Sequence, residues 1–284
     1  MTGRSILLTF ANERFRKGQE LLARSARLAG FDEVICASPD DWRGSAFAER
    51  HRDTLAQPRG CGYWLWKPWL IQRELKRLGP DDILFYSDAS IDGYYRFSRF
   101  PKCLVSLVRG GEHGFVVGPL LRQHGPVSRW TKRDALVLMN ADRPEVSSRP
   151  TVQATWSLWR KTASSLDLLE KWLAASSDPR ILTDMANTQG LPNHPDFVDH
   201  RHDQSILSIL VHRDNLPVLD LSHTGIFEAM ARRPNSEMTH RFLKAPRNVE
   251  KLLAGKPALP AFATELVKAA VMRRVFRQRT AHIP

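Results

Sequence analysis

The sequence of 284 residues has few cysteines, no long hydrophobic run and no internal repeat. Cys36, Cys61 and Cys103 are far apart and form no CxxC motif, so neither a disulfide framework nor a cysteine zinc site is indicated. The first apolar run, Ile6 to Phe10, is too short for the core of a signal peptide or for a membrane span. These absences favour a chain that folds in the reducing cytoplasm.

Acidic residues are also in short supply. The 30 Asp and Glu residues face 42 Lys and Arg residues, which gives a formal net charge of +12. Such a charge indicates an anionic partner: nucleic acid, acidic lipid head groups or a phosphate-bearing substrate. The 42% of hydrophobic residues and 25% of charged residues are ordinary for a folded globular protein.

The apolar pattern predicts an α/β fold. Strand-like runs at 6–10 and 34–37 enclose a helical pattern at 15–28 that ends at Gly30. A further cycle follows, with a helix at 68–78 and a central strand at 83–87. This β-α-β order predicts a Rossmann-like, mostly parallel central sheet flanked by helices.

The second half is less regular. Strands are predicted at 114–117 and 151–158, and extended chain at 218–219. Helices are predicted at 102–108, 131–139, 166–173 and 203–212, with a short one near 181–186 inside a proline-containing loop. We expect residues 1–233 to form the main domain and residues 234–284 a C-terminal extension with a basic helix at 261–279.

Asp88 directly follows the predicted strand 83–87. Ligands of open α/β sheets bind outside the carboxyl ends of the strands. A carboxylate there can hold Mg²⁺ or Mn²⁺ while the cation bridges a diphosphate. The alternative is a strand-end turn in which Asp88 and Ser90 cap nearby backbone amides.

Residues 60–69 combine two glycines with three tryptophans, a tyrosine and a lysine. Lys67 precedes the predicted helix, so its ammonium and the helix amides can meet a phosphate together. The other interpretation is an aromatic anchor that packs the helix onto the sheet. The two interpretations do not exclude each other.

Polar residues open the helix predicted at 203–212. Asp203 and Gln204 can cap its first turn, or they can face a site with His200 and His202. A zinc site from the two histidines and Asp203 has little support, because no fourth ligand is evident nearby. His223 follows the extended residues 217–219, where a lone histidine is more often structural.

Five segments in this order resemble bacterial glycosyltransferases of the GT-A type that act in capsule and surface-polysaccharide synthesis. The resemblance covers residues 5–225. Its segments are Leu8-Thr-Phe-Ala11, Gly62-Tyr-Trp-Leu-Trp-Lys-Pro68, Asp82-Ile-Leu-Phe-Tyr-Ser-Asp-Ala89, Trp130-Thr-Lys-Arg-Asp-Ala135 and His200-Arg-His-Asp-Gln-Ser205.

The resemblance implies a nucleoside-diphosphate sugar as donor, with a UDP-sugar favoured, and a saccharide or lipid-linked acceptor. The implied donor contacts are Thr9, Phe10, Ala11, Tyr63, Trp66, Lys67, Asp88, Ser90 and Gln204. The implied acceptor contacts are Trp130, His200 and His202.

The resemblance also implies Mn²⁺ or Mg²⁺, held by Asp88, Ser90 and His223. Here the sequence departs from the family, because Ser90 stands where the Asp-x-Asp motif has its second carboxylate, and Asp92 or His223 would have to compensate. Asp88 and Asp203 are the implied catalytic residues. Asp203 would be the base if transfer inverts the anomeric carbon, and would bind or stabilise the sugar if transfer retains configuration.

Three alternatives stay open. The basic helix at 261–279 can lie on the anionic inner face of the cell membrane, or dock on the core. The chain can be a sugar-nucleotide-binding relative without activity. A nucleic-acid-binding protein is the rival from another class, but basic residues do not cluster around the aromatic block and no nucleic-acid-binding motif is present, so no nucleic-acid partner is expected.

Overall fold

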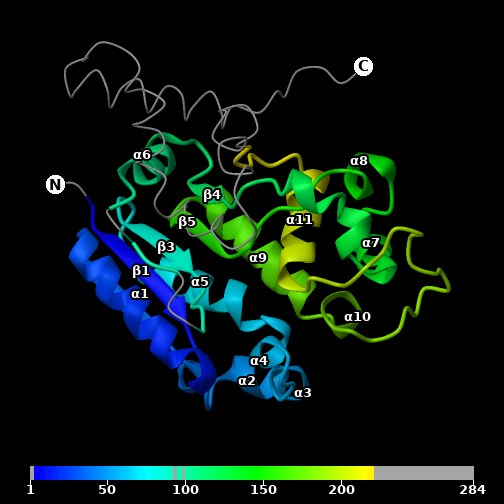
Figure 1. Ribbon diagram of the computed structural model, residues 1–284, viewed down its shortest axis with the longest axis horizontal. Helices are drawn as coiled ribbons and strands as arrows, with labels where there is room; N and C mark the ends of the chain where they lie inside the picture. The colour runs from blue at the N-terminus through cyan, green and yellow to red at the C-terminus, as the bar shows by residue number, and fades with distance from the viewer. Residues whose placement is uncertain (1–2, 92–94, 98–99, 221–284) are drawn as a thin grey trace, which may run out of the picture.

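The computed structural model describes residues 3–91, 95–97 and 100–220, which form an α/β fold around a five-stranded sheet (Figure 1). The strands, in sheet order, are β2 (Glu33–Ala37), β1 (Ser5–Phe10), β3 (Ile83–Ser87), β5 (Trp156–Arg160) and β4 (Phe115–Val117). β1 pairs in parallel with β2 and β3, whereas β5 runs antiparallel to β3 and β4. Four strands therefore point the same way, which confirms the predicted mostly parallel sheet.

The opening β-α-β unit also agrees with the prediction. Helix α1 (Arg16–Ala29) connects β1 to β2 and lies along the sheet in Figure 1. It ends at Gly30, whose φ of 100° is left-handed, a conformation in which glycine meets little steric penalty. The predicted strand 83–87 coincides with β3.

Alternate residues of the central strands face opposite layers, as the period of two in a strand requires. Ile6, Leu8 and Tyr86 pack with helices α5 (Trp66–Arg77), α9 (Ala163–Ser176) and α11 (Asp203–Arg213). Leu7 and Phe85 pack with α1 and with α6 (Lys102–Gly110). Helices thus cover both faces of the sheet.

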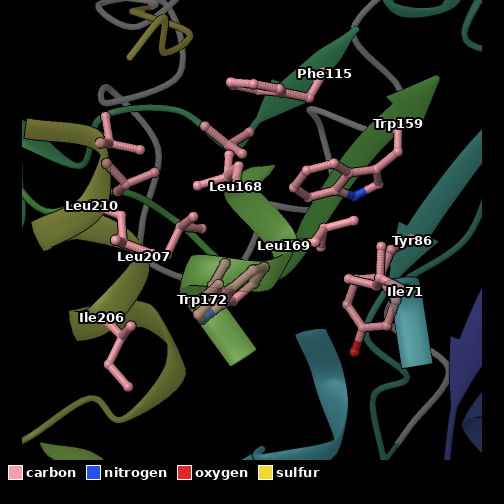
Figure 2. Packing of buried hydrophobic residues seen from close by; sticks show 14 of the residues in the cluster. Ile71, Tyr86, Phe115, Trp159, Leu168, Leu169, Trp172, Ile206, Leu207 and Leu210 are labelled. Atoms are coloured by element: carbon pink, nitrogen blue, oxygen red, sulfur yellow. The ribbon is translucent and has the colours of Figure 1, made fainter. Parts of the chain in front are cut away.

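The larger core fixes α11 to the sheet through α9. Figure 2 shows Trp172 of α9 in the same cluster as Leu207 of α11 and Ile71 of α5. The indole nitrogen of Trp172 donates a hydrogen bond to the carbonyl of Asp203 at 3.1 Å. This packing sets the position of the first turn of α11, from which Asp203 projects.

The entry into β5 differs from the prediction. The predicted strand 151–158 is split: Val152 forms an isolated bridge with Leu120, and β5 begins only at Trp156. Because β5 is antiparallel to β3, Trp156 lies opposite Ser87. Ala154 and Thr155 are therefore brought to the carboxyl end of β3, next to Asp88.

Other predicted helices are present with shifted ends, such as α7 (Arg133–Leu138) and α10 (Pro179–Leu182). The remaining short helices are η1 (Glu13–Phe15), η2 (Pro39–Asp41), α2 (Ala46–Arg50), α3 (Arg52–Leu55), α4 (Gly60–Tyr63), η3 (Arg122–His124), η4 (Val127–Trp130) and α8 (Pro144–Ser147). The predicted boundary at residues 233 and 234 and the basic helix at 261–279 lie outside the described residues. Among the helices described, none is long and apolar enough to cross a membrane.

Candidate functional site

Three segments that are distant in sequence meet at the carboxyl end of β3. The ammonium of Lys67, in the first turn of α5, lies 3.2 Å from Oδ1 of Asp88 and 2.6 Å from Oδ2 of Asp203. Asp88 directly follows β3, and Asp203 is the first residue of α11. One buried cation therefore joins two carboxylates that come from different layers of the fold.

The start of β5 supports this cluster. The ammonium of Lys67 donates to the carbonyl of Ala154 at 3.3 Å, and the amide of Asp88 donates to the carbonyl of Thr155 at 2.8 Å. The hydroxyl of Tyr86 donates to Oδ1 of Asp88 at 2.5 Å. In Figure 2 this hydroxyl points out of the hydrophobic cluster, while the ring of Tyr86 stays beside Ile71.

Exposure decreases from Asp88 to Lys67. The side chain of Asp88 is 26% exposed, that of Asp203 is 7% exposed and that of Lys67 is 2% exposed. Oδ1 of Asp88 faces Tyr86 and Lys67, whereas Oδ2 makes no hydrogen bond or ion pair with the described residues. Asp88 is thus the carboxylate that a ligand can reach most directly.

Burial and charge set the protonation of the cluster. Burial raises the pKa of Asp203 to about 6, although the ammonium of Lys67 opposes the shift. Burial alone would lower the pKa of Lys67, but Asp203 and Asp88 together outweigh it, so this pKa is raised. Burial, reinforced by the charge of Asp88, raises the pKa of Tyr86 well above its usual value, so Tyr86 remains a hydrogen-bond donor.

A left-handed turn precedes α5 and directs Lys67. Cys61, Tyr63 and Trp64 have φ values of 54°, 54° and 60°, which non-glycine residues rarely adopt. Gly62 has a φ of 93°, and a Cβ atom there would lie 2.8 Å from Cα of Leu55. This position therefore needs glycine for both its conformation and its close approach.

A second strained residue immediately precedes Asp203. His202 has a φ of 49° and a ψ of −115°, and its ring stacks on Trp64 with centroids 5.6 Å apart. Its Nδ1 donates to the carbonyl of Leu182 at 2.8 Å, and the side chain is buried. Backbone strain of this kind persists only where surrounding contacts hold it. His202 therefore helps to position Asp203, and its buried ring does not lie in an acceptor site as predicted.

The side chains predicted to contact the donor from β1 and α5 lie in the core. Phe10 and Trp66 stack at a centroid distance of 3.8 Å, and their exposed fractions are 6% and 3%. The side chains of Thr9 and Ala11 are also buried. The prediction of donor contacts by these four side chains is corrected, because all four are buried and the two aromatic rings stack on each other. The alternative interpretation of Trp66 as a packing anchor describes the structure.

Two further predicted roles are corrected. Lys67 does not face an open phosphate site, since its ammonium is taken up by Asp88, Asp203 and Ala154. His200 is buried with both ring nitrogens in hydrogen bonds: Nδ1 accepts from the amide of Lys132, and Nε2 donates to the carbonyl of Ile181. It is a structural histidine instead of an acceptor contact.

Other predicted site residues remain partly exposed, as a ligand contact requires. They are Tyr63, Ser90, Trp130 and Gln204. Trp130 and Gln204 line one pocket together. Ser90 lies just beyond Asp88, and its hydroxyl accepts a hydrogen bond from the amide of Tyr95 at 3.1 Å.

The residues described do not assemble a metal site. No group of three His, Cys, Asp or Glu side chains with suitable geometry occurs among them, and this also applies to the zinc site considered for His200, His202 and Asp203. The cation between Asp88 and Asp203 is the ammonium of Lys67. His223 and Asp92 lie outside the described residues, so Mn²⁺ or Mg²⁺ stays a prediction and no catalytic step is derived through a metal.

Sequence reasoning missed Tyr86 and Ala154. Tyr86 could have been found, because it precedes Asp88 by two residues and side chains two apart in a strand share a face. Ala154 contributes only its carbonyl oxygen, for which a sequence gives no signal. Arg129 and Arg201, which line the pocket with Trp130 and Gln204, were also missed.

Comparisons with known proteins show a distant structural likeness. No protein-family model matches the chain, and no curated protein matches it. Among solved structures, the apo structure of WbbM, a bifunctional glycosyltransferase, is similar with a TM-score of 0.43 and 11% sequence identity. The similarity covers 75% of this chain but only 38% of that one. A likeness of this size assigns neither a family nor an activity.

Proposed function

We propose that this protein is a GT-A-type glycosyltransferase that takes a sugar from a nucleoside-diphosphate sugar. The observation that carries the proposal is the ion-paired cluster of Lys67, Asp88 and Asp203. These residues belong to three of the five segments on which the resemblance to bacterial glycosyltransferases rests. Their convergence at the carboxyl end of β3 is the location where an α/β sheet binds its ligand.

Glycosyl transfer requires a base for the acceptor hydroxyl and stabilisation of an oxocarbenium-like centre. Asp203 suits the first task, because a pKa of about 6 leaves it mostly ionised at neutral pH yet basic enough to accept a proton. The ammonium of Lys67 holds this carboxylate in place at 2.6 Å. In this proposal Asp203 is the base of an inverting transfer.

Asp88 is assigned to the donor. Its Oδ1 is oriented by Tyr86 and Lys67, which leaves Oδ2 of this partly exposed side chain for the donor. If Mn²⁺ or Mg²⁺ is bound, Asp88 would hold it and the cation would neutralise the diphosphate. A UDP-sugar as donor, a saccharide or lipid-linked acceptor, surface-polysaccharide synthesis, and a cytoplasmic location at the membrane are extensions that rest on the resemblance alone.

Thermal-shift measurements with UDP-, GDP- and CMP-sugars, each with and without Mn²⁺, test the proposal. A ligand at 100 times its dissociation constant stabilises a protein by about 2.7 kcal/mol, so a bound nucleotide sugar should raise the melting temperature by several degrees. The stabilisation should be lost in Asp88→Asn. The absence of any shift with all three classes of nucleotide sugar would contradict the proposal.

A sugar-nucleotide-binding protein without transferase activity is the second candidate. The position of Ser90 favours it, since a hydroxyl that accepts from the amide of Tyr95 is a poor replacement for a second carboxylate. The two candidates differ in turnover. Binding of a nucleotide sugar without release of the nucleoside diphosphate, across a panel of acceptors, would select the second candidate.

A further inference from the structure

A pocket that includes Gln204, the residue after Asp203, is rich in arginine and glutamine. It has a volume of about 340 Å³ and is lined by Gln123, His124, Arg129, Trp130, Arg201 and Gln204. This volume is at the lower end of the range for small-molecule sites. The lining residues include two guanidinium groups and two carboxamides, and none of them is acidic.

The two guanidinium groups are held over one aromatic ring. Cζ of Arg201 lies 4.5 Å from the ring centroid of Trp130, and Cζ of Arg129 lies 5.8 Å from it. The indole nitrogen donates to the carbonyl of His124 at 2.7 Å, which fixes the ring. Cation–π contacts of this kind orient an arginine without neutralising its charge.

The backbone under the pocket is also fixed. The carbonyl of Trp130 accepts hydrogen bonds from the amide of Arg201 at 3.1 Å and from the hydroxyl of Ser205 at 2.5 Å. The amide of Val198 donates to the carbonyl of Arg129 at 2.8 Å. The two arginines therefore project from segments that are tied together.

The positive charge is only partly compensated. Arg129 forms no ion pair with the part of the chain that the structure describes. Nε of Arg201 lies 3.6 Å from Asp199, but this carboxylate also pairs with Arg59 at 3.2 Å. A pair of oriented guanidinium groups with so little opposing charge suits a carboxylate or phosphate.

The pocket includes the residue that directly follows Asp203 of the proposed transfer site. Gln204 directly follows Asp203 in the first turn of α11, and successive side chains of a helix point about 100° apart. Asp203 contacts Lys67, while Gln204 lines the pocket. The carboxamides of Gln123 and Gln204 can each donate and accept, as sugar hydroxyls require.

We propose that this pocket binds an acidic sugar of the acceptor, with Arg129 and Arg201 on its anionic group and Gln123 and Gln204 on its hydroxyls. The inference rests on the proposed function, to which it adds the chemical class of the acceptor. The anionic group is a carboxylate of the sugar or a phosphate ester on it. Trp130, predicted to contact the acceptor, orients the two arginines.

Direct binding of small sugars to the full chain tests the inference by calorimetry. Glucuronate and glucose 1-phosphate should bind at least about tenfold more tightly than glucose, because a hydrogen bond to a charged group is stronger than one between neutral groups. If glucuronate binds more tightly than glucose 1-phosphate, the group recognised is a carboxylate. If glucose 1-phosphate binds more tightly, it is a phosphate ester. The advantage should be lost in the Arg129→Gln/Arg201→Gln double variant and kept in Arg52→Gln, which changes an exposed arginine on α3.

Equal affinity for glucose and both acidic sugars would overturn the inference, as would an unchanged preference in the double variant. Inorganic phosphate that binds as tightly as glucose 1-phosphate would also overturn it, because the pocket would then not recognise a sugar. These measurements involve no nucleotide sugar and no transfer. They can therefore fail while nucleotide-sugar binding succeeds, and the reverse, so the two proposals are tested separately.

Discussion

The ammonium of Lys67 lies 2.6 Å from Oδ2 of Asp203, and both side chains are almost completely buried. Buried ion pairs gain little over apolar packing when complete, but the loss of one partner leaves a charge without compensation. Asp88, whose side chain is 26% exposed, is the third member of this cluster. We therefore expect the cluster to respond sharply to changes in charge.

Replacement of Lys67 by methionine should destabilise the fold by about 3 kcal/mol or more, because Asp203 would remain buried without its cation. Lys171→Met is the matched control, since Lys171 is 45% exposed and surface pairs contribute about 0–1 kcal/mol. Urea unfolding of both variants measures the difference. The double variant Lys67→Met/Asp203→Asn should recover part of the loss, and equal effects of the two lysine substitutions would contradict the role of Lys67.

Stability should depend on pH through Asp203. Its pKa of about 6 in the folded state lies above the ordinary value near 4 in the unfolded chain. The folded state therefore holds the proton more tightly, and this contribution is complete below pH ~4 and is lost as the pH rises through ~6. The advantage of the wild type over Asp203→Asn should shrink by roughly 2–3 kcal/mol across this window. Urea titrations at several pH values measure it, and a constant difference would show that Asp203 has an ordinary pKa.

Any side chain at Gly62 should destabilise the turn before α5. Gly62→Ala should cost about 2 kcal/mol or more, since it combines a φ of 93° with a Cβ only 2.8 Å from Cα of Leu55. Gly44→Ala is the control, because Gly44 has a φ of 70° but no atom within 4 Å of the new Cβ. Thermal unfolding should show a larger loss at Gly62. Equal losses would mean that the close approach to Leu55 relaxes without cost.

The sequence was most informative where local pattern determines structure. The run of apolar residues from Ile83 to Ser87 predicted β3 and placed Asp88 at its carboxyl end. Periodicity predicted α1 to within a residue or two, and Gly30 marked its end. These features depend on neighbours in the chain, and a sequence displays such neighbours directly.

The contacts that define the site depend on distant segments. The residues of β5 do not indicate in which direction the strand pairs, so its antiparallel pairing with β3 could not be predicted. The left-handed φ values of Tyr63, Trp64 and His202 oppose the local preference of these residues and are held by tertiary packing. These turns set the direction of Lys67, which the sequence alone does not reveal. The sequence predicts that its ammonium meets a phosphate, whereas in the structure it contacts two carboxylates and a carbonyl.

The most direct test of the account is to measure the turnover of a nucleotide sugar by the Asp88→Asn variant, with Asp81→Asn as the control. Asp88 lies at the proposed donor site, whereas Asp81 is an exposed residue at the opposite end of β3. The account predicts that Asp88→Asn loses about 100-fold or more in kcat/KM, a cost of roughly 2.7 kcal/mol in transition-state stabilisation, while the variant remains folded. Asp81→Asn should retain wild-type turnover. Undiminished turnover by a folded Asp88→Asn variant would contradict the central claim.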